Sequence, residues 1–107
     1  MSKRIYTNQF IQEKLAEIVK SKPIDTLNKF CTKEYSKSIF DINYPLLVKA
    51  PTNWRYEQKR ELVKDNKGVN RWTWKYEFQK KGFSYAITTQ WYDRNDEYVQ
   101  RWLRKQI

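Results

Sequence analysis

The chain of 107 residues contains no histidine, so the usual general base near neutral pH and the commonest metal ligand are both missing. Metal-independent chemistry on a phosphodiester then relies on lysine, arginine, tyrosine and carboxylates. Lys and Arg stabilise the negative charge of phosphoryl transfer, and Tyr or Glu can move the proton of a 2′-hydroxyl group. The residues suited to these roles are Lys59, Arg60, Arg71, Lys75, Tyr92 and Arg94. They permit a metal-independent ribonuclease, although we prefer the interpretation that the protein is not an enzyme.

Metal and thiol chemistry have little support in the sequence. Asp41, followed later by Glu57-Gln58-Lys59, matches the loose pattern of nucleases that hold Mg²⁺ between two carboxylates. Such a match is expected by chance in a chain with 12 acidic and 22 basic residues. Cys31 is the single cysteine, which excludes an internal disulfide and a thiolate metal cluster. Because phosphate-binding Gly-rich loops, serine triads and zinc motifs are missing too, we predict no metal and no cofactor.

The charge of the chain favours a polyanionic partner. The formal net charge is +10, and the half from residue 51 onward contributes +6, from 13 basic and 7 acidic residues. A surplus of this size creates a field that attracts nucleic acid first, and acidic protein or membrane surfaces after it. DNA and RNA are not distinguished by charge alone. We therefore predict a nucleic-acid-binding protein.

The first half of the sequence predicts helices. Residues 7–21 place Ile11, Leu15 and Ile18 at helical spacing, and Pro23 marks the end of that segment. Residues 25–42 predict a second, weaker helix. Residues 43–51, which end in a proline, are expected to be extended.

The second half predicts a small sheet, because its apolar period changes from near 3.6 to two. Strands are expected within 54–64, 69–79 and 83–92, and Gly68 and Gly82 fall in the turns between them. A closing helix is expected at 96–106. The fold class is therefore α+β: two N-terminal helices, a three-stranded antiparallel β-meander and a C-terminal helix packed on one sheet face. We expect residues 1–107 to form a single domain, with its helical part at 7–42 and its sheet at 54–92.

Alternation along the strands assigns side chains to two faces of this sheet. Large rings share one face, which we expect to be buried beneath the helices: Trp72, Trp74, Tyr76, Phe78, Phe83, Tyr85 and Trp91, with Ile87. The other face combines basic residues with Thr and Gln, which suit contacts to phosphates and base edges. With the turns and the last helix, the predicted nucleic-acid-binding set is Arg55, Lys59, Arg71, Thr73, Lys75, Lys80, Lys81, Thr88, Gln90, Arg101, Arg104 and Lys105.

Other interpretations of the same residues stay open. If the rings are exposed, they form a stacking platform for unpaired bases. If Lys and Glu pair across strands, the polar face is an ordinary solvated surface. Exposed Trp and Tyr can also anchor a protein partner, as in a small inhibitor from a phage or mobile element that docks on a host protein complex.

Two resemblances accompany these patterns. Residues 69–105, with their alternating aromatics, glycine turn and Arg101-Trp102-Leu103, resemble the small DNA-binding modules at the start of some tyrosine recombinases. That resemblance implies that the sheet meets the major groove of DNA. The order of helices and antiparallel strands, together with the basic charge, is similar to the RelE/ParE class of toxins, which implies a ribonuclease toxin.

Location is predicted from what the segments lack. The first apolar run is short and interrupted by polar residues, unlike a signal peptide. No stretch approaches the roughly 20 apolar residues that span a bilayer. We therefore expect a cytoplasmic protein, in a bacterium or an infected host cell, with no membrane partner.

Overall fold

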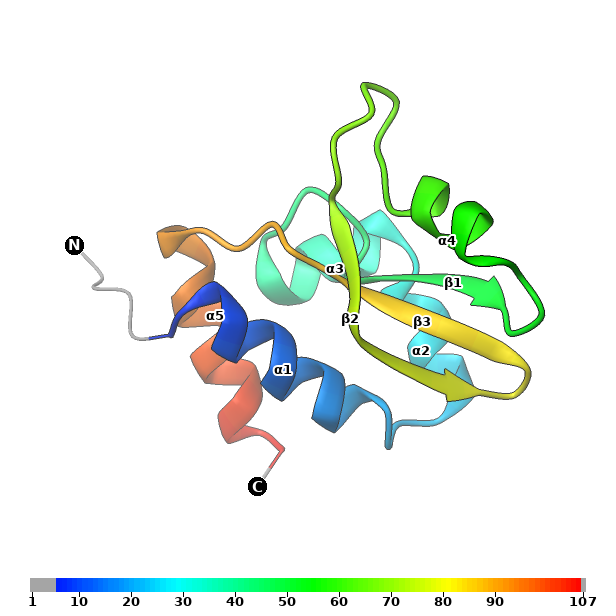
Figure 1. Cartoon of the computed structure of the whole chain (residues 1–107). Helices are drawn as coiled ribbons and strands as arrows, with labels where there is room; N and C mark the ends of the chain where they lie inside the picture. The colour runs from blue at the N-terminus through cyan, green and yellow to red at the C-terminus, as the bar shows by residue number, and fades with distance from the viewer. Residues whose placement is uncertain (1–5, 107) are drawn as a thin grey trace.

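The computed structural model describes residues 6–106, and its fold is α+β, as the sequence predicts. Its helices and strands follow the order α1 (Asn8–Val19), α2 (Ile24–Phe30), α3 (Lys33–Phe40), β1 (Leu47–Pro51), α4 (Tyr56–Leu62), β2 (Trp72–Lys80), β3 (Phe83–Thr88) and α5 (Asp93–Arg104). The strands form one antiparallel sheet in the order β1-β3-β2 (Figure 1). Among the described residues, no helix combines the length and the apolar character needed to cross a membrane.

Helix α1 confirms the helix predicted at 7–21. Thr7 caps it, because the hydroxyl oxygen of Thr7 accepts a hydrogen bond of 3.1 Å from the backbone N–H of Phe10. Ile11, Leu15 and Val19 recur every fourth residue and are fully buried. This stripe attaches α1 to the sheet and makes one wall of the core.

The single helix predicted at 25–42 is wrong, because the chain breaks at Thr32 into α2 and α3. The hydroxyl group of Thr32 donates to the carbonyl of Lys29 at 2.6 Å, and its oxygen accepts from the N–H of Tyr35 at 3.4 Å. Such side-chain bonds to nearby backbone compete with a continuous helix. Buried Ser36 then holds the two helices together by donating to the carbonyl of Phe30 at 3.1 Å.

The strand predicted within 54–64 is also wrong, since its central part forms helix α4. The side-chain oxygen of Gln58 accepts a hydrogen bond of 2.9 Å from the N–H of Arg55 and so stabilises the first turn. The third strand is β1, in the segment that was predicted only to be extended. Because β1 pairs with β3 rather than β2, the sheet is not the predicted β-meander.

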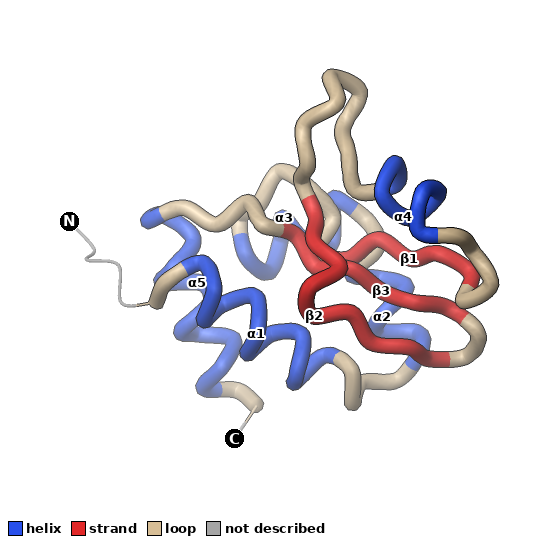
Figure 2. The backbone as a smooth tube through the Cα atoms, in the orientation of Figure 1, coloured by secondary structure: helices blue, strands red, loops and turns tan. Residues whose placement is uncertain are grey.

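A β-bulge in β2 separates the rings that were predicted to share one face. Trp72 lies opposite Thr88, but Phe78 lies opposite Tyr85, so the register shifts by an odd number of residues between the two pairs. Figure 2 shows that β2 bends along its length. Directly opposed residues share a face, and an odd shift exchanges the faces. Trp72 and Phe78 therefore point to opposite sides of the sheet, and the prediction of one aromatic face is wrong.

Different elements pack against the two sides of the sheet. Phe78 stacks on Tyr85 with ring centroids 5.1 Å apart, on the side of the main helical core. On the other side, the indole N–H of Trp74 donates to the carbonyl of Lys59 in α4 at 2.8 Å. Residues 84–88 of the central strand β3 are buried as a result.

The C-terminal helix is present, as predicted, but α5 begins at Asp93 instead of residue 96. Val99 is fully buried in the core. Trp102 meets Phe40 of α3 edge-on, with ring centroids 5.6 Å apart. These contacts fix the end of α5 beside α3, which matters for the charged residues at its last turn.

Candidate functional site

The polar sheet face predicted to bind nucleic acid does not exist as one surface. Arg55 and Lys59 belong to the start and middle of α4 rather than to a strand. Thr88 is fully buried and its hydroxyl group donates to the carbonyl of Arg71 at 2.9 Å. Thr73 is half-buried and accepts from the N–H of Lys75 at 3.1 Å, whereas Lys75 itself is exposed on β2.

A second part of the predicted set does come together, around Gln90. The side-chain oxygen of Gln90 accepts from the guanidinium of Arg71 at 2.9 Å and from the hydroxyl group of Tyr92 at 3.1 Å. The guanidinium of Arg71 also lies 5.3 Å from the ring centroid of Tyr44. Its charge is compensated, because Arg71 Nε lies 2.8 Å from a carboxylate oxygen of Asp65. We call Arg71, Gln90 and Tyr92 the Gln90 cluster.

Asp65 organises the loop at 63–71, which projects beyond the sheet (Figure 1). Its second carboxylate oxygen accepts from the N–H groups of Lys67 at 2.8 Å and Val69 at 3.0 Å. The hydrogen bond from Arg71 and these backbone donors lower the pKa of Asp65 to about 2. Asp65 is therefore ionised beside Arg71 throughout the physiological pH range.

Replacing this carboxylate gives a prediction about pH. A folded-state pKa below the unfolded value of about 3.9 means that Asp65 stabilises the fold above that range. The stabilisation is lost as the pH falls through about 2. We expect Asp65→Asn to have a lower urea midpoint than the wild type near neutral pH, and the two midpoints to converge in acid. A gap that stays constant across this pH range contradicts the role given to the Asp65 carboxylate.

The six residues suited to ribonuclease chemistry divide into two groups. Arg71 and Tyr92 belong to the Gln90 cluster, and Arg94 lies near the ring of Tyr92 and 3.8 Å from a carboxylate oxygen of Asp41. Lys59 instead pairs with Glu77 at 2.8 Å, and Arg60 and Lys75 lie over the rings of Tyr56 and Tyr76. Among the described residues, no hydrogen bond or ion pair joins the two groups.

The structure adds no further metal ligands, among the described residues, to the pattern of Asp41 and Glu57. Asp41 closes α3 in a left-handed conformation, with φ of 57°, whereas Glu57 lies in the first turn of α4. Within residues 6–106, no three His, Cys, Asp or Glu side chains gather as a metal site. Burial raises the pKa of the half-buried Cys31 thiol to about 11, so this side chain is a neutral thiol near neutral pH.

Another set of basic residues gathers where three segments meet. The ammonium group of Lys80, at the end of β2, donates to the backbone carbonyls of Lys20 and Lys22 after α1. The ammonium group of Lys22 in turn donates to Gln106, just beyond α5. In Figure 1 the connection from α1 to α2 accordingly lies between the β2–β3 turn and the end of α5. Lys49 of β1 joins this region, with its ammonium group 4.7 Å from the ring centroid of Phe83.

We call this region the basic edge. It comprises Lys20, Lys22, Lys49 and Lys80, and Arg104, which lines one groove with Lys22. We include Lys81 and Lys105 because they directly follow Lys80 and Arg104 in the sequence. Four of its members were predicted from the sequence, namely Lys80, Lys81, Arg104 and Lys105. The other three were missed, although the lysines flanking Ser21 at the end of the first predicted helix already formed a small cluster.

The basic edge keeps its charge. Five ion pairs join described residues, and their basic partners are Lys59, Lys64, Arg71, Arg94 and Arg101. None of the seven basic-edge residues takes part in an ion pair within the part of the chain that the structure describes. Lys22, Lys49 and Lys80 are instead held by neutral oxygen acceptors, such as the side-chain oxygen of Asn28, 3.0 Å from Lys49 Nζ. Such bonds position an ammonium group without neutralising it.

The hydrogen bonds from Lys80 to neutral carbonyls have a structural role as well. The carbonyls that accept from Lys80 belong to the C-terminal end of α1, where a cation interacts favourably with the helix dipole. That role accounts for Lys80 but not for the exposed Lys20, Lys81, Arg104 and Lys105.

Comparison with known proteins adds no candidate, since no family model, no curated protein and no solved structure matches this chain.

Proposed function

We propose that this protein binds nucleic acid, and that it does so through the basic edge rather than through one face of its sheet. The observation that carries the proposal is that Lys80 and Lys22 join the end of β2, the segment after α1 and the end of α5. The seven basic side chains on these segments and on β1 have no carboxylate partner among the described residues. The formal net charge of +10 adds a long-range field that favours the approach of a polyanion.

The chemistry of this surface suits phosphates. A lysine ammonium group is a compact charge on a flexible stem, and it binds phosphate oxygens without reading the base sequence. Each neutralised phosphate releases counterions, so affinity falls with salt, and about six contacts give a slope of log K against log [salt] near −5 for duplex DNA. We therefore expect a loss of roughly 10³-fold in affinity between about 50 and 200 mM salt.

Two triple variants with the same net charge test where the nucleic acid binds. The first, Lys20→Gln with Lys81→Gln and Lys105→Gln, removes three exposed charges from the basic edge. The second, Arg60→Gln with Lys67→Gln and Lys75→Gln, removes three exposed charges from α4, the 63–71 loop and β2. Affinity for DNA and RNA oligonucleotides is measured by fluorescence anisotropy at several salt concentrations.

The expected result is that only the basic-edge triple flattens the salt dependence, by about 3 in slope, because it removes three phosphate contacts. The matched control loses the same charge, so it should show only the small effect of a weaker long-range field. A larger loss of affinity in the control variant would show that nucleic acid binds at α4 and β2 instead. A weak salt dependence of the wild type would end the proposal and favour a protein partner, such as a host complex.

A second candidate function is cleavage of RNA, and the Gln90 cluster favours it. The Tyr92 hydroxyl group and the Arg71 guanidinium share one acceptor, at 3.1 Å and 2.9 Å, so a proton-transferring group and a cation lie side by side. The acceptor orients both groups, and Tyr92 is exposed enough to meet a ligand. The compensating carboxylate of Asp65 reduces the charge available to stabilise a phosphorane, so binding without cleavage ranks first.

Incubation of the protein with RNA in the presence of a chelator tests this second candidate. Cleavage by the wild type that disappears in Tyr92→Phe, while RNA affinity is kept, would assign the proton transfer to Tyr92. The phenylalanine retains the ring and removes only the hydroxyl group. Intact RNA under conditions in which binding is seen removes the ribonuclease from consideration.

A further inference from the structure

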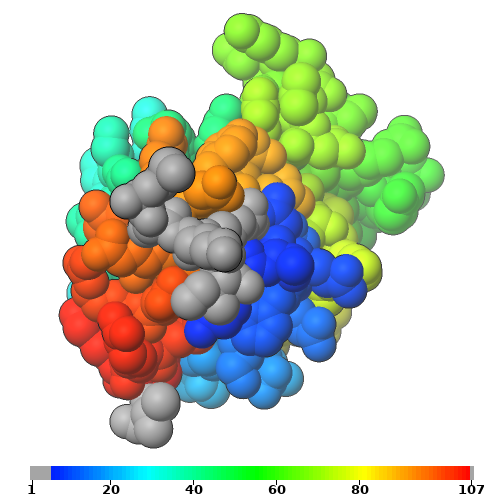
Figure 3. Space-filling model, turned by 90° about the vertical axis from the view of Figure 1, so that its left-hand side faces the viewer, coloured from blue at the N-terminus to red at the C-terminus, as the bar shows by residue number. Residues whose placement is uncertain are grey.

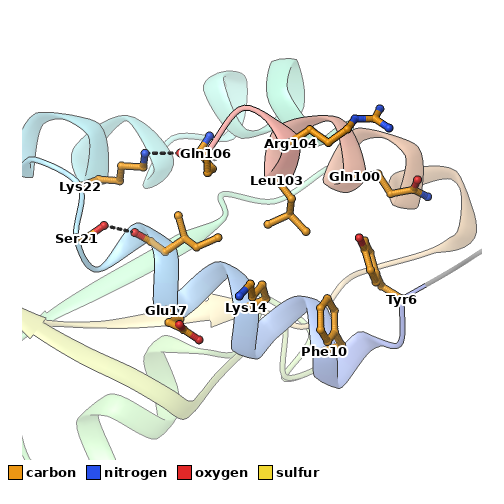
Figure 4. Close-up of a pocket in the computed structure, with 11 residues that line it drawn as sticks. Tyr6, Phe10, Lys14, Glu17, Ser21, Lys22, Gln100, Leu103, Arg104 and Gln106 are labelled. Atoms are coloured by element: carbon orange, nitrogen blue, oxygen red, sulfur yellow. Dashed lines mark hydrogen bonds between the residues drawn. The ribbon is translucent and has the colours of Figure 1, made fainter.

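A groove lies between α1 and α5. Figure 3 shows the face of the molecule on which these two helices, coloured blue and orange to red, are exposed. Its volume is about 760 Å³. Figure 4 shows Tyr6 and Phe10 at one end of it and Lys22 with Gln106 at the other. From Phe10 to Val19, the end of α1, the helical rise is about 14 Å, several times the ~3.4 Å of axial rise per phosphate along one strand of a duplex. The groove is therefore long enough to follow a strand of nucleic acid.

The spacing of residues on the two helices explains why a groove forms. In α1, Ile11, Leu15 and Val19 face the core, and the neighbouring stripe of Phe10, Lys14 and Ile18 lines the groove one residue behind them. In α5, Val99 lies in the core, and Gln100, Leu103 and Arg104 line the groove. The lining is therefore partly apolar: Phe10 is exposed in the groove, whereas Leu103 also packs against the core.

Phe10 provides a flat apolar surface at one end of this groove. It is 41% exposed, which is high for a large apolar side chain. Its ring stacks on Tyr6, with centroids 4.7 Å apart and an angle of 21° between the ring planes. The stack limits the orientations that Phe10 can adopt, so little entropy is lost when another flat ring stacks on it.

The groove is continuous with the basic edge. Lys22 and Arg104 belong to both, and Lys14 adds a third cation to the lining, against one carboxylate, Glu17. A nucleic-acid strand bound along the basic edge can therefore continue into the groove while its phosphates stay close to basic side chains. A basic groove with an aromatic surface inside it is the arrangement that proteins use for single-stranded nucleic acid.

We propose that the α1/α5 groove binds single-stranded nucleic acid, with an unpaired base stacked on Phe10 and the phosphates near Lys14, Lys22 and Arg104. The inference rests on the proposed function and narrows its ligand from any nucleic acid to a strand with unpaired bases. A duplex can still contact the basic edge through its phosphates, but its stacked bases do not reach Phe10.

The test compares a single-stranded oligonucleotide of about 15 nucleotides with its duplex, both carrying one 2-aminopurine, whose fluorescence is quenched by stacking. Phe10→Ala removes the stacking surface, and Phe10→Trp retains one. Tyr56→Ala is the matched control, because Tyr56 is a more exposed ring on α4, at 69%. Circular dichroism melting checks that all three variants are folded.

The expected result is that Phe10→Ala lowers affinity for the single strand about 10-fold or more and abolishes quenching, while duplex affinity is unchanged. Phe10→Trp and Tyr56→Ala should both bind like the wild type. Equal losses in Phe10→Ala and Tyr56→Ala, or an equal loss for the duplex, overturn the stacking inference alone. Displacement of the strand from the wild type but not from Phe10→Ala by poly-glutamate would assign the groove to an acidic protein segment instead. Failure of the wild type to bind either form defeats the proposed function itself.

Discussion

Trp91→Ala is expected to lose about 4 kcal/mol of unfolding free energy, a large fraction of the roughly 5–15 kcal/mol that stabilises a typical domain. Trp91 is 2% exposed and lies between the end of β3 and the start of α5. Its ring meets Phe40 edge-on with centroids 5.6 Å apart, and its indole N–H donates to the carbonyl of Thr88 at 2.9 Å. The substitution therefore creates a cavity and leaves a buried carbonyl without its donor.

Trp54→Ala is the matched control, since Trp54 is 36% exposed and precedes α4 at the surface. We expect this variant to lose about 1 kcal/mol or less. Urea unfolding followed by far-ultraviolet circular dichroism gives both free energies, and an unchanged slope with urea would show that the transitions are comparable. Similar losses in the two variants would contradict the assignment of Trp91 to the core.

The sequence predicts elements well where a local signal and burial agree. In α1, the buried residues recur every four positions and Thr7 caps the start, so period and cap point to the same helix. In the β2–β3 hairpin, Gly82 adopts a φ of 82°, as a tight turn requires. These elements depend on neighbours in the sequence, which a periodicity search can detect.

Helix α4 was missed because its residues carry no burial signal. None of the residues of Tyr56–Leu62 is buried, so the alternation of Trp54 and Tyr56 has no relation to a core. A better signal was available in composition, because Glu, Gln, Lys, Arg and Leu are strong helix formers and β-branched residues are absent from this segment.

The positions of the candidate sites depend on contacts that local patterns do not contain. The β2 bulge exchanges the faces of Trp72 and Phe78, and regular alternation cannot reveal such a shift in register. Lys80 reaches the carbonyl of Lys20, a residue 60 positions earlier. The sequence therefore identified many of the basic residues but not which of them share a surface.

Basic residues differ in whether they are paired with carboxylates, and this difference separates the basic edge from several other basic positions. Several basic residues elsewhere meet carboxylates, as Lys59 of α4 meets Glu77 and Arg101, in the last turn of α5, meets Glu97, each at 2.8 Å. Exposed pairs of this kind contribute little to stability, but they cancel the local field. At the basic edge, neutral oxygens instead hold Lys22, Lys49 and Lys80, so the local field of these lysines is retained.

Asn95→Ala is expected to lose about 3 kcal/mol of unfolding free energy, because Asn95 is fully buried and makes three hydrogen bonds. Its amide nitrogen donates to the carbonyls of Phe40 and Asp41, each at 3.0 Å, and its oxygen accepts from the N–H of Tyr92 at 2.8 Å. These bonds tie the end of α3 to the start of α5. Alanine leaves three backbone groups unpaired, two of them only partly accessible to water.

Asn43→Ala is the control for this substitution, since Asn43 is exposed in the connection between α3 and β1. Its expected cost is within about 0.5 kcal/mol. Because Asn95 also fixes the backbone of Tyr92, its loss should broaden the Tyr92 and Gln90 side-chain signals in NMR spectra, even in conditions where the variant stays folded. A stable Asn95→Ala protein with unchanged Tyr92 signals would show that the helix junction does not depend on this amide, and that the Gln90 cluster is positioned by the sheet alone.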